Sequence, residues 1–77
     1  MTRYSYTVVL IPDTEAGGYV VEVPALPGCV TQGESVDEAL AMAQNAISMW
    51  IRDMAADGEP IPVEREASRL ATVEVER

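Results

Sequence analysis

The stretch that decides the fold is Val23–Leu40, which reads VPALPGCVTQGESVDEAL. Its two prolines and its first glycine end one strand and turn the chain, and Cys29–Gln32 forms a short strand after the turn. Ser35, with Glu38 three residues later and an apolar run behind it, predicts a capping box. In this motif the serine hydroxyl accepts from the Glu38 N–H, and the Glu38 carboxylate accepts from the Ser35 N–H. The stretch therefore sets where a sheet ends and where a helix begins.

Towards the N-terminus, two alternating runs predict two more strands, Tyr4–Ile11 and Tyr19–Val23. The connection between them begins with Pro12 and continues with turn residues, so we expect a hairpin. Together with Cys29–Gln32, these two strands make an antiparallel meander.

Beyond the capping box, Ser35 to about Asp57 is predicted to be one long helix, because its apolar residues recur at steps of four and three. Gly58 supplies the stop signal, and the prolines that follow it prevent continuation. The residues expected to face the sheet are Val36, Leu40, Ala43, Ile47, Trp50 and Met54, widened by Ala39 and Ile51.

Near the C-terminus, Leu70–Glu76 alternates apolar and polar residues and predicts a final edge strand. The predicted fold class is therefore α+β: an antiparallel three-stranded meander, one long helix packed on one face and the final edge strand, in the order βββαβ. A chain of 77 residues with 48% hydrophobic content suits one small domain, residues 1–77.

Composition also bears on the compartment. No apolar run approaches the roughly 20 residues that a membrane span needs, and Met1–Ser5 lacks the features of a secretory signal. The lone cysteine, Cys29, cannot form an internal disulfide, which fits a reducing environment. We expect a soluble cytoplasmic protein without membrane association.

The charge balance is strongly acidic: thirteen Asp and Glu residues face five arginines and no lysine, for a net charge of −8. Such a chain should be repelled by nucleic acid, because affinity there comes largely from phosphate neutralisation. An acidic surface suits a basic protein partner, although the same charge also serves solubility alone. Both interpretations stay open on composition.

Residues for catalysis are scarce. Without histidine or lysine, the chain lacks His-based acid–base chemistry, His metal ligands and Schiff-base formation. Cys29 is interpreted as a small apolar residue, and Asp53 and Asp57 as solvated surface charges. Glu22 is the only acid within a central strand pattern, and one carboxylate does not make a two-metal site. We expect no catalytic, cofactor-binding or metal-ligating residues and therefore no enzyme.

Two surfaces suggest partners. Met42, Ala46 and Met49 lie off the main helical stripe, which indicates either a wide core-facing side or a contact surface for another chain. One helix covers one face of the sheet, so Val9, Ile11 and Val20 are left on the opposite face. Because a domain this small gains core by burying such a face, we expect a homo-oligomer, a dimer or a tetramer.

The run Gly18–Gly33, GYVVEVPALPGCVTQG, resembles the signature of the HicB-like antitoxin family. Ser35–Leu40 extends the resemblance into the helix, and it continues past Trp50 to Pro62. The resemblance implies a partial ribonuclease H-like fold that lacks the catalytic acids. It also implies a partner: in the family this domain binds and neutralises HicA, a small mRNA-cleaving toxin with a double-stranded-RNA-binding-like fold and a catalytic histidine.

Many members of that family continue into a helix-turn-helix or ribbon-helix-helix segment that binds DNA. After Pro62 this chain has only about fifteen residues, mostly one predicted strand, so we expect a short form without that segment. The function expected from the resemblance is a non-catalytic antitoxin of a type II toxin-antitoxin system. The alternative is a stand-alone HicB-like oligomeric binding module without a toxin; a residual nuclease is disfavoured.

Overall fold

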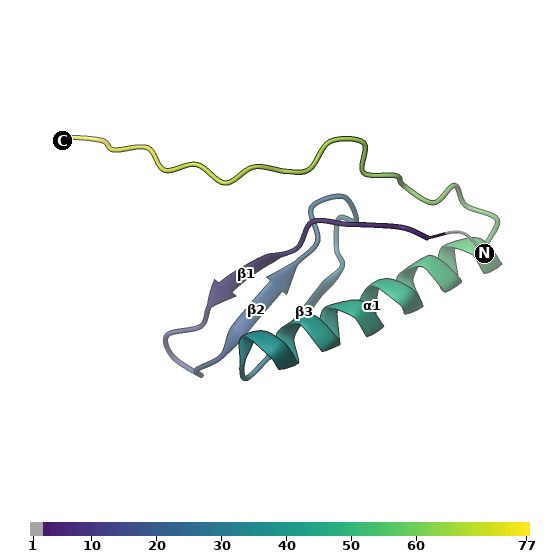
Figure 1. Cartoon of the computed structure of the whole chain (residues 1–77), viewed down its shortest axis with the longest axis horizontal. Helices are drawn as coiled ribbons and strands as arrows, with labels where there is room; N and C mark the ends of the chain where they lie inside the picture. Colours follow the sequence, from purple (N-terminus) through teal and green to yellow (C-terminus); the bar gives the residue numbers. More distant parts are fainter. Residues whose placement is uncertain (1–2) are drawn as a thin grey trace.

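The computed structural model describes residues 3–77, and Figure 1 shows three strands followed by one long helix and an extended C-terminal segment. The elements in chain order are β1 (Val9–Pro12), β2 (Tyr19–Glu22), β3 (Val30–Gly33) and α1 (Val36–Ala56). Met1 and Thr2 lie outside the described residues, and with them part of the Met1–Ser5 segment from which no secretory signal is expected. Within residues 3–77, no helix combines the length and the apolar character of a membrane span.

The three strands form an antiparallel sheet in the order β1-β2-β3, which confirms the predicted meander. The first strand is shorter than predicted, because β2 ends at Glu22 and residues before Val9 lack a paired neighbour in the sheet. Pro12 closes β1 instead of lying beyond it. A proline is tolerated there because β1 is an edge strand and the missing N–H need not join a ladder.

Helix α1 begins as the sequence predicts. Ser35 has extended backbone angles, and its Oγ accepts from the Glu38 N–H at 3.1 Å. The reciprocal half of the capping box differs from the prediction: the Glu38 carboxylate accepts from the Glu34 N–H at 3.2 Å instead of the Ser35 N–H. The carboxylate thus still lies at the helix N-terminus, where negative charge is favoured by the helix dipole.

The helix ends in a Schellman motif. Gly58 has a φ of +72°, its N–H donates to the Ala55 carbonyl at 3.2 Å, and the Glu59 N–H donates to the Met54 carbonyl at 2.9 Å. A left-handed residue at this position is the usual place for glycine, because a Cβ would strain the backbone. The predicted stop at Gly58 is therefore confirmed.

The core lies between the sheet and α1, which covers one face of the sheet, so the predicted α+β architecture is confirmed. Small residues let the helix approach closely. A Cβ on Gly33 would lie 2.4 Å from the Ala39 nitrogen, so the backbones of β3 and α1 are in near contact there. Ala39 and Ala43 are buried against Val21 at this crossing.

This close approach changes which helix residues are buried. The sequence predicted Val36 and Leu40 as core residues, but they are 45% and 44% exposed. The helix instead rests on its alanines, so the row of Val36 and Leu40 turns to one side of the crossing. Ile47 and Ile51 continue that row and line a groove with Tyr4, which precedes β1. The exposed row therefore lies on the β1 side of the sheet.

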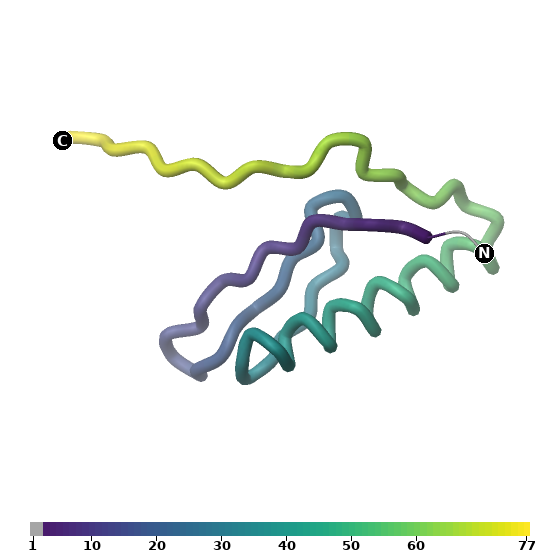
Figure 2. Tube along the Cα trace, viewed as in Figure 1, coloured from purple at the N-terminus to yellow at the C-terminus, as the bar shows by residue number. Residues whose placement is uncertain are grey.

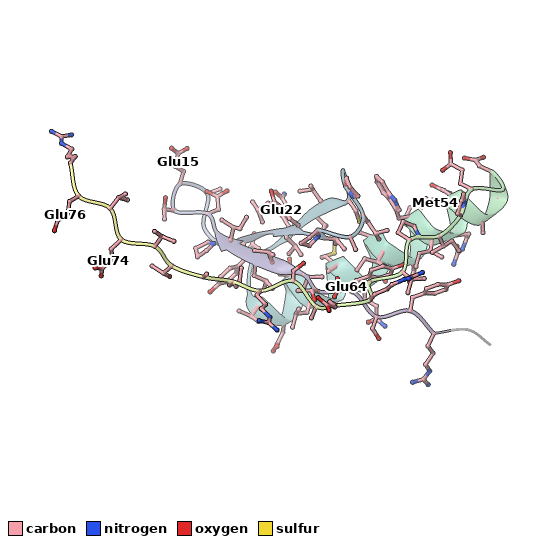
Figure 3. All side chains as sticks on the ribbon, turned by 90° about the horizontal axis from the view of Figure 1, so that it is seen from above. Glu15, Glu22, Met54, Glu64, Glu74 and Glu76 are labelled. Atoms are coloured by element: carbon pink, nitrogen blue, oxygen red, sulfur yellow. The ribbon has the colours of Figure 1, made fainter. Side chains whose placement is uncertain are left out.

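The predicted final strand, Leu70–Glu76, was wrong: residues 65–77 carry no strand pairing, although they are extended. We call this segment the C-terminal arm. Figures 1 and 2 show it leaving the body of the molecule on the β1 side. Its apolar residues are solvated, with Leu70, Val73 and Val75 exposed by 84%, 80% and 91%. The chain bends at Arg65 and Glu66, and Figures 1 and 3 show the arm diverging from β1 beyond this bend, so residues 67–77 do not pair with it.

The root of the arm is fixed even though the arm itself is free. The Tyr6 hydroxyl donates to the Pro62 carbonyl. The Glu64 carboxylate accepts from both the Thr7 N–H at 2.9 Å and the Thr7 hydroxyl at 2.6 Å. These hydrogen bonds, led by the one from the Thr7 hydroxyl, hold the pKa of Glu64 below its usual range. The chain is thus attached beside the segment that leads into β1, up to residue 64.

Candidate protein-binding surface

The loop between β2 and β3 is a compact turn closed by its own backbone. The Leu26 N–H donates to the Val23 carbonyl and the Cys29 N–H donates to the Leu26 carbonyl, each at 2.9 Å, while the Val23 N–H donates to the Cys29 carbonyl at 3.2 Å. This geometry points Leu26 inward, where it is only 1% exposed. Leu26 therefore makes the loop part of the core, and the outer surface of the loop is held in a fixed position.

Gly28 fits the loop to the helix. It has a φ of +93°, and a Cβ placed on it would lie 3.3 Å from Cη2 of Trp50. Only a residue without a side chain meets both requirements without strain. Trp50, half-buried, packs against the cluster formed by Val23, Leu26 and Cys29. The predicted contact of Trp50 with the core is confirmed, and it joins the C-terminal half of α1 to the loop.

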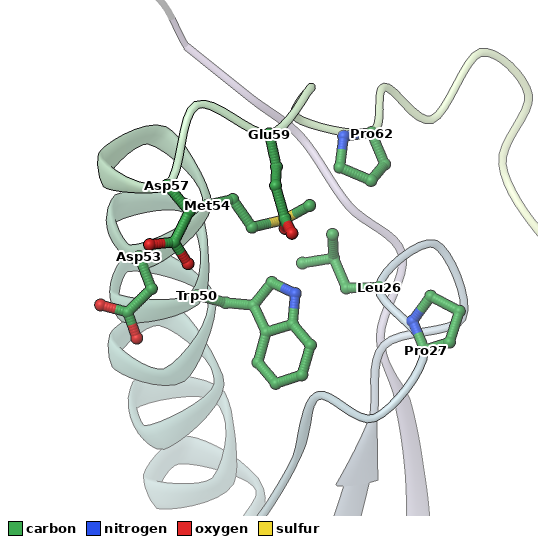
Figure 4. A pocket seen from close by; sticks show the side chains of 8 residues that line it. All are labelled: Leu26, Pro27, Trp50, Asp53, Met54, Asp57, Glu59 and Pro62. Carbon is green, nitrogen blue, oxygen red and sulfur yellow. The ribbon is translucent and has the colours of Figure 1, made fainter.

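A groove of about 350 Å³ opens where this loop meets the end of α1 (Figure 4). We call it the acidic groove. Its apolar lining comes from the loop, the helix and the segment after it: Leu26, Pro27, Trp50, Met54 and Pro62. Three carboxylates complete the lining, from Asp53, Asp57 and Glu59. Figure 4 shows Asp53 and Asp57 on the end of the helix and Glu59 on the turn that follows, with the Glu59 side chain extending toward Met54.

The electrostatics of the acidic groove favour a cation. It lies at the C-terminal end of α1, where the helix dipole is negative, and no basic residue lies in the last helical turn. The three carboxylates add to the same potential. The face of the Trp50 ring beside them can bind a cation, or the aliphatic stem of an arginine or lysine. The groove is thus suited to a basic side chain of another molecule.

Sequence reasoning interpreted Asp53 and Asp57 as solvated charges, and both are indeed exposed. It did not anticipate that they lie together with Trp50 and Glu59. The spacing of Trp50, Asp53 and Asp57 is visible in the sequence, because steps of three and four share a helix side. Glu59 reaches the groove because the Schellman turn at Gly58 directs the chain back toward the helix. The residue pattern alone does not show this direction.

The other candidate residues fall outside this groove. Cys29 is buried, with 3% exposure, and burial raises the pKa of its thiol, so it is the small apolar residue that was predicted. Glu22 is exposed on the outer face of the sheet, where its cross-strand neighbours are Val9 on β1 and Val30 on β3. Among residues 3–77, no group of three or more His, Cys, Asp or Glu side chains is arranged to hold a metal ion.

The methionine flank of α1 divides between the two interpretations left open above. Ala46 packs against the cluster around Leu26, as a wide core-facing side requires. Met42 and Met49 instead are 42% and 61% exposed. Met42 lines a shallow groove with Gln32 and Glu34 near β3, so this flank faces away from β1. The two methionines are therefore available on the surface of the chain.

Residues 6–76 match the model of the HicB-like antitoxin of bacterial toxin-antitoxin systems. The chain belongs to this family. The match includes the β2–β3 loop, the acidic groove and most of the C-terminal arm, so the predicted family resemblance is confirmed over nearly the whole chain.

Individual relatives agree with this assignment. A UPF0150 protein of Thermoplasma acidophilum is 49% identical over 57 residues, which cover 74% of this chain and 81% of that protein. A UPF0150 protein of Synechocystis is 38% identical over 61 residues, covering 79% and 76% respectively. Antitoxin HicB 1 of Photorhabdus laumondii is 41% identical over 58 residues, covering 75% of this chain and 37% of that protein.

Proposed function

We propose that this HicB-like protein is a non-catalytic, cytoplasmic antitoxin that binds and neutralises a HicA-type, mRNA-cleaving toxin in a type II system. Residues 1–77 act as one HicB-like domain on a partial ribonuclease H-like scaffold, and the chain itself does not bind nucleic acid. The acidic groove is the observation that carries the proposal, because it is a preformed concave surface with a strongly negative lining.

A protein that cleaves RNA must present positive charge to the phosphate backbone. The groove complements such a surface in charge, and Trp50 supplies an apolar and aromatic wall for an arginine or lysine stem. A net charge of −8 also favours fast encounter with a basic partner at low ionic strength. Occupying RNA-binding arginines or lysines in this way would block the access of mRNA to the toxin.

A second candidate function is a stand-alone oligomeric binding module without a toxin. It is favoured by the outer face of the sheet, where Ile11 and Val30 are 40% and 56% exposed. Their neighbours in the pairing register, Val20 and Glu22, lie on the same face. Self-association is part of both proposals, because the exposed apolar residues of this small sheet are best covered by another copy.

Co-expression with a HicA-type ribonuclease, sought as a small basic reading frame beside the gene for this chain, tests the main proposal. We expect the two proteins to copurify through a tag on this chain, and RNA cleavage by the ribonuclease to be suppressed in the complex. Full RNA cleavage in the presence of the recovered chain would refute the antitoxin function and leave the stand-alone module.

A matched pair of triple variants tests the groove. Replacing Asp53, Asp57 and Glu59 by their amides removes the acidic lining and should weaken toxin binding about tenfold or more, mainly through faster dissociation. The control replaces Glu15, Glu34 and Glu66, which are exposed outside the acidic groove and the outer face of the sheet, by glutamine. This control changes the net charge by the same amount. It should lower the association rate and leave the dissociation rate unchanged. Equal dissociation rates for the two variants would place toxin binding elsewhere on the chain.

A further inference from the structure

The C-terminal arm and the open edge of β1 are two unsatisfied features of the same chain. The sheet has three strands of four residues each, and β1 lies at one edge of it. Every second residue of an edge strand turns its N–H and C=O outward, where they can pair with a further strand. The arm is extended, alternates apolar and polar residues over Leu70–Glu76, and is unpaired in the described chain.

We propose that the arm of one copy adds as a fourth strand to the β1 edge of a second copy, and that the exchange is reciprocal. This inference rests on the self-association proposed above and identifies the surface that carries it. Each chain has one β1 edge and one arm. A twofold pair therefore pairs the β1 edge of each copy with the arm of the other, in a closed assembly.

The side chains around the edge support this position. Val36 and Leu40 are exposed on the side of α1 nearest to the β1 edge of the sheet. Leu10 on β1 is half-buried. A strand added at β1 would lie below this exposed row. Ala71, Val73 and Val75 share one face of the arm and would cover it.

The charges fix the orientation of the added strand. Glu74 and Glu76 share the opposite face from Val73 and Val75, so they remain in water when the valines face the helix. Figure 3 shows both glutamates on the arm, away from the body of the molecule. Seven residues of strand span roughly 23 Å, which is long enough to follow the whole of β1.

We expect the β1 edge of each chain to pair with the arm of a second copy and not with its own arm, because the root of its own arm is held in place. The Glu64 carboxylate accepts from Thr7 and the Pro62 carbonyl accepts from Tyr6. Beyond the bend at Arg65 and Glu66, the arm diverges from its own β1 (Figures 1 and 3). Pairing with the chain's own β1 would require the arm to change this course. Pairing with another copy keeps both the root and the bend.

Light scattering on the full chain at micromolar concentration gives the first measurement. We expect the mass of two chains for the wild type and of one chain for Val73→Pro, with unchanged helical circular dichroism, because proline cannot donate to the strand ladder. Ala67→Pro, which lies before the paired segment, should keep the mass of two chains. A one-chain wild type would overturn self-association itself. A two-chain Val73→Pro would overturn the arm exchange while leaving self-association through the outer face.

Cysteine crosslinking gives the second measurement. In a Cys29→Ala background, Ile11→Cys and Glu74→Cys are made on separate chains of different tag length, mixed and oxidised. Both positions lie on the solvent-facing side of the proposed four-stranded sheet, so a mixed crosslinked pair is expected. If one chain carrying both cysteines closes an internal disulfide on dilution while the mixture gives none, the arm pairs with its own β1 and the exchange is refuted.

Toxin inhibition is assayed on Val73→Pro separately, since the acidic groove lies on the opposite end of α1 from Ala39.

Discussion

Replacing Gly28 with alanine tests how the β2–β3 loop is fitted to the helix. The φ of +93° strains any residue with a Cβ by about 1–2 kcal/mol. The new Cβ would also lie 3.3 Å from Cη2 of Trp50, and this tight contact adds about 1 kcal/mol of overpacking. The free energy of unfolding should therefore fall by about 2–3 kcal/mol, or about 10–20 °C in Tm for a domain of this size.

Gly17→Ala is the matched control. Gly17 has a similar φ of +81°, but nothing lies within 4 Å of its Cβ position, so it measures the backbone strain alone. The difference between the two variants isolates the contact with Trp50. Because Trp50 is the sole tryptophan, its fluorescence emission reports directly on that contact during thermal unfolding.

The two variants give a clear refutation. If Gly28→Ala and Gly17→Ala lower Tm equally, and Gly28→Ala leaves the emission maximum unchanged, then Trp50 does not press on the loop. The account of how the loop, the helix and the wall of the acidic groove are held together would then be wrong. A smaller penalty for Gly28→Ala in a Trp50→Phe background would instead confirm the contact, because the shorter ring removes the crowded atoms.

Two further predictions concern the helix start and the arm. Ser35→Ala should lower the free energy of unfolding by about 1 kcal/mol, because the Glu38 N–H loses its acceptor, and toxin affinity should be unchanged; a loss of affinity at unchanged stability would place Ser35 in the interface. Glu64 has a folded pKa below its unfolded value, so its contribution is present above the unfolded pKa and is lost as pH falls through the folded pKa. The Thr7 amide resonance should therefore shift with acid in the wild type and not in Glu64→Gln, and the same shift in both would refute this attachment.

Local signals in the sequence predicted much of the fold. The prolines and glycines around Leu26, the cap at Ser35 and the stop at Gly58 each act through a few neighbouring residues, so the order and type of β1, β2, β3 and α1 follow from them. The boundaries moved by a few residues where a strand needed a partner, as in the shortening of Tyr4–Ile11 to Val9–Pro12.

The errors came from contacts that depend on distance between elements. Periodicity gives the apolar side of α1 but not its rotation, which Gly33 and the alanines set by allowing near contact with β3. An alternating pattern shows that Leu70–Glu76 can pair but not that an edge lies beside it. The acidic groove depends on the Schellman turn that returns Glu59, so its three acids could be placed only from the structure.

The exposed arm has a consequence for how long the protein survives. Proteases cut extended, unpaired backbone without waiting for a domain to unfold, and the arm, residues 65–77, offers thirteen residues in a single chain. If a second copy takes up the arm, cleavage slows as the protein becomes more abundant, by mass action. The half-life would then rise with the chain's own concentration, so a falling supply would accelerate its own removal. Limited proteolysis at two protein concentrations would measure this, and equal cleavage rates of the arm at both would rule it out.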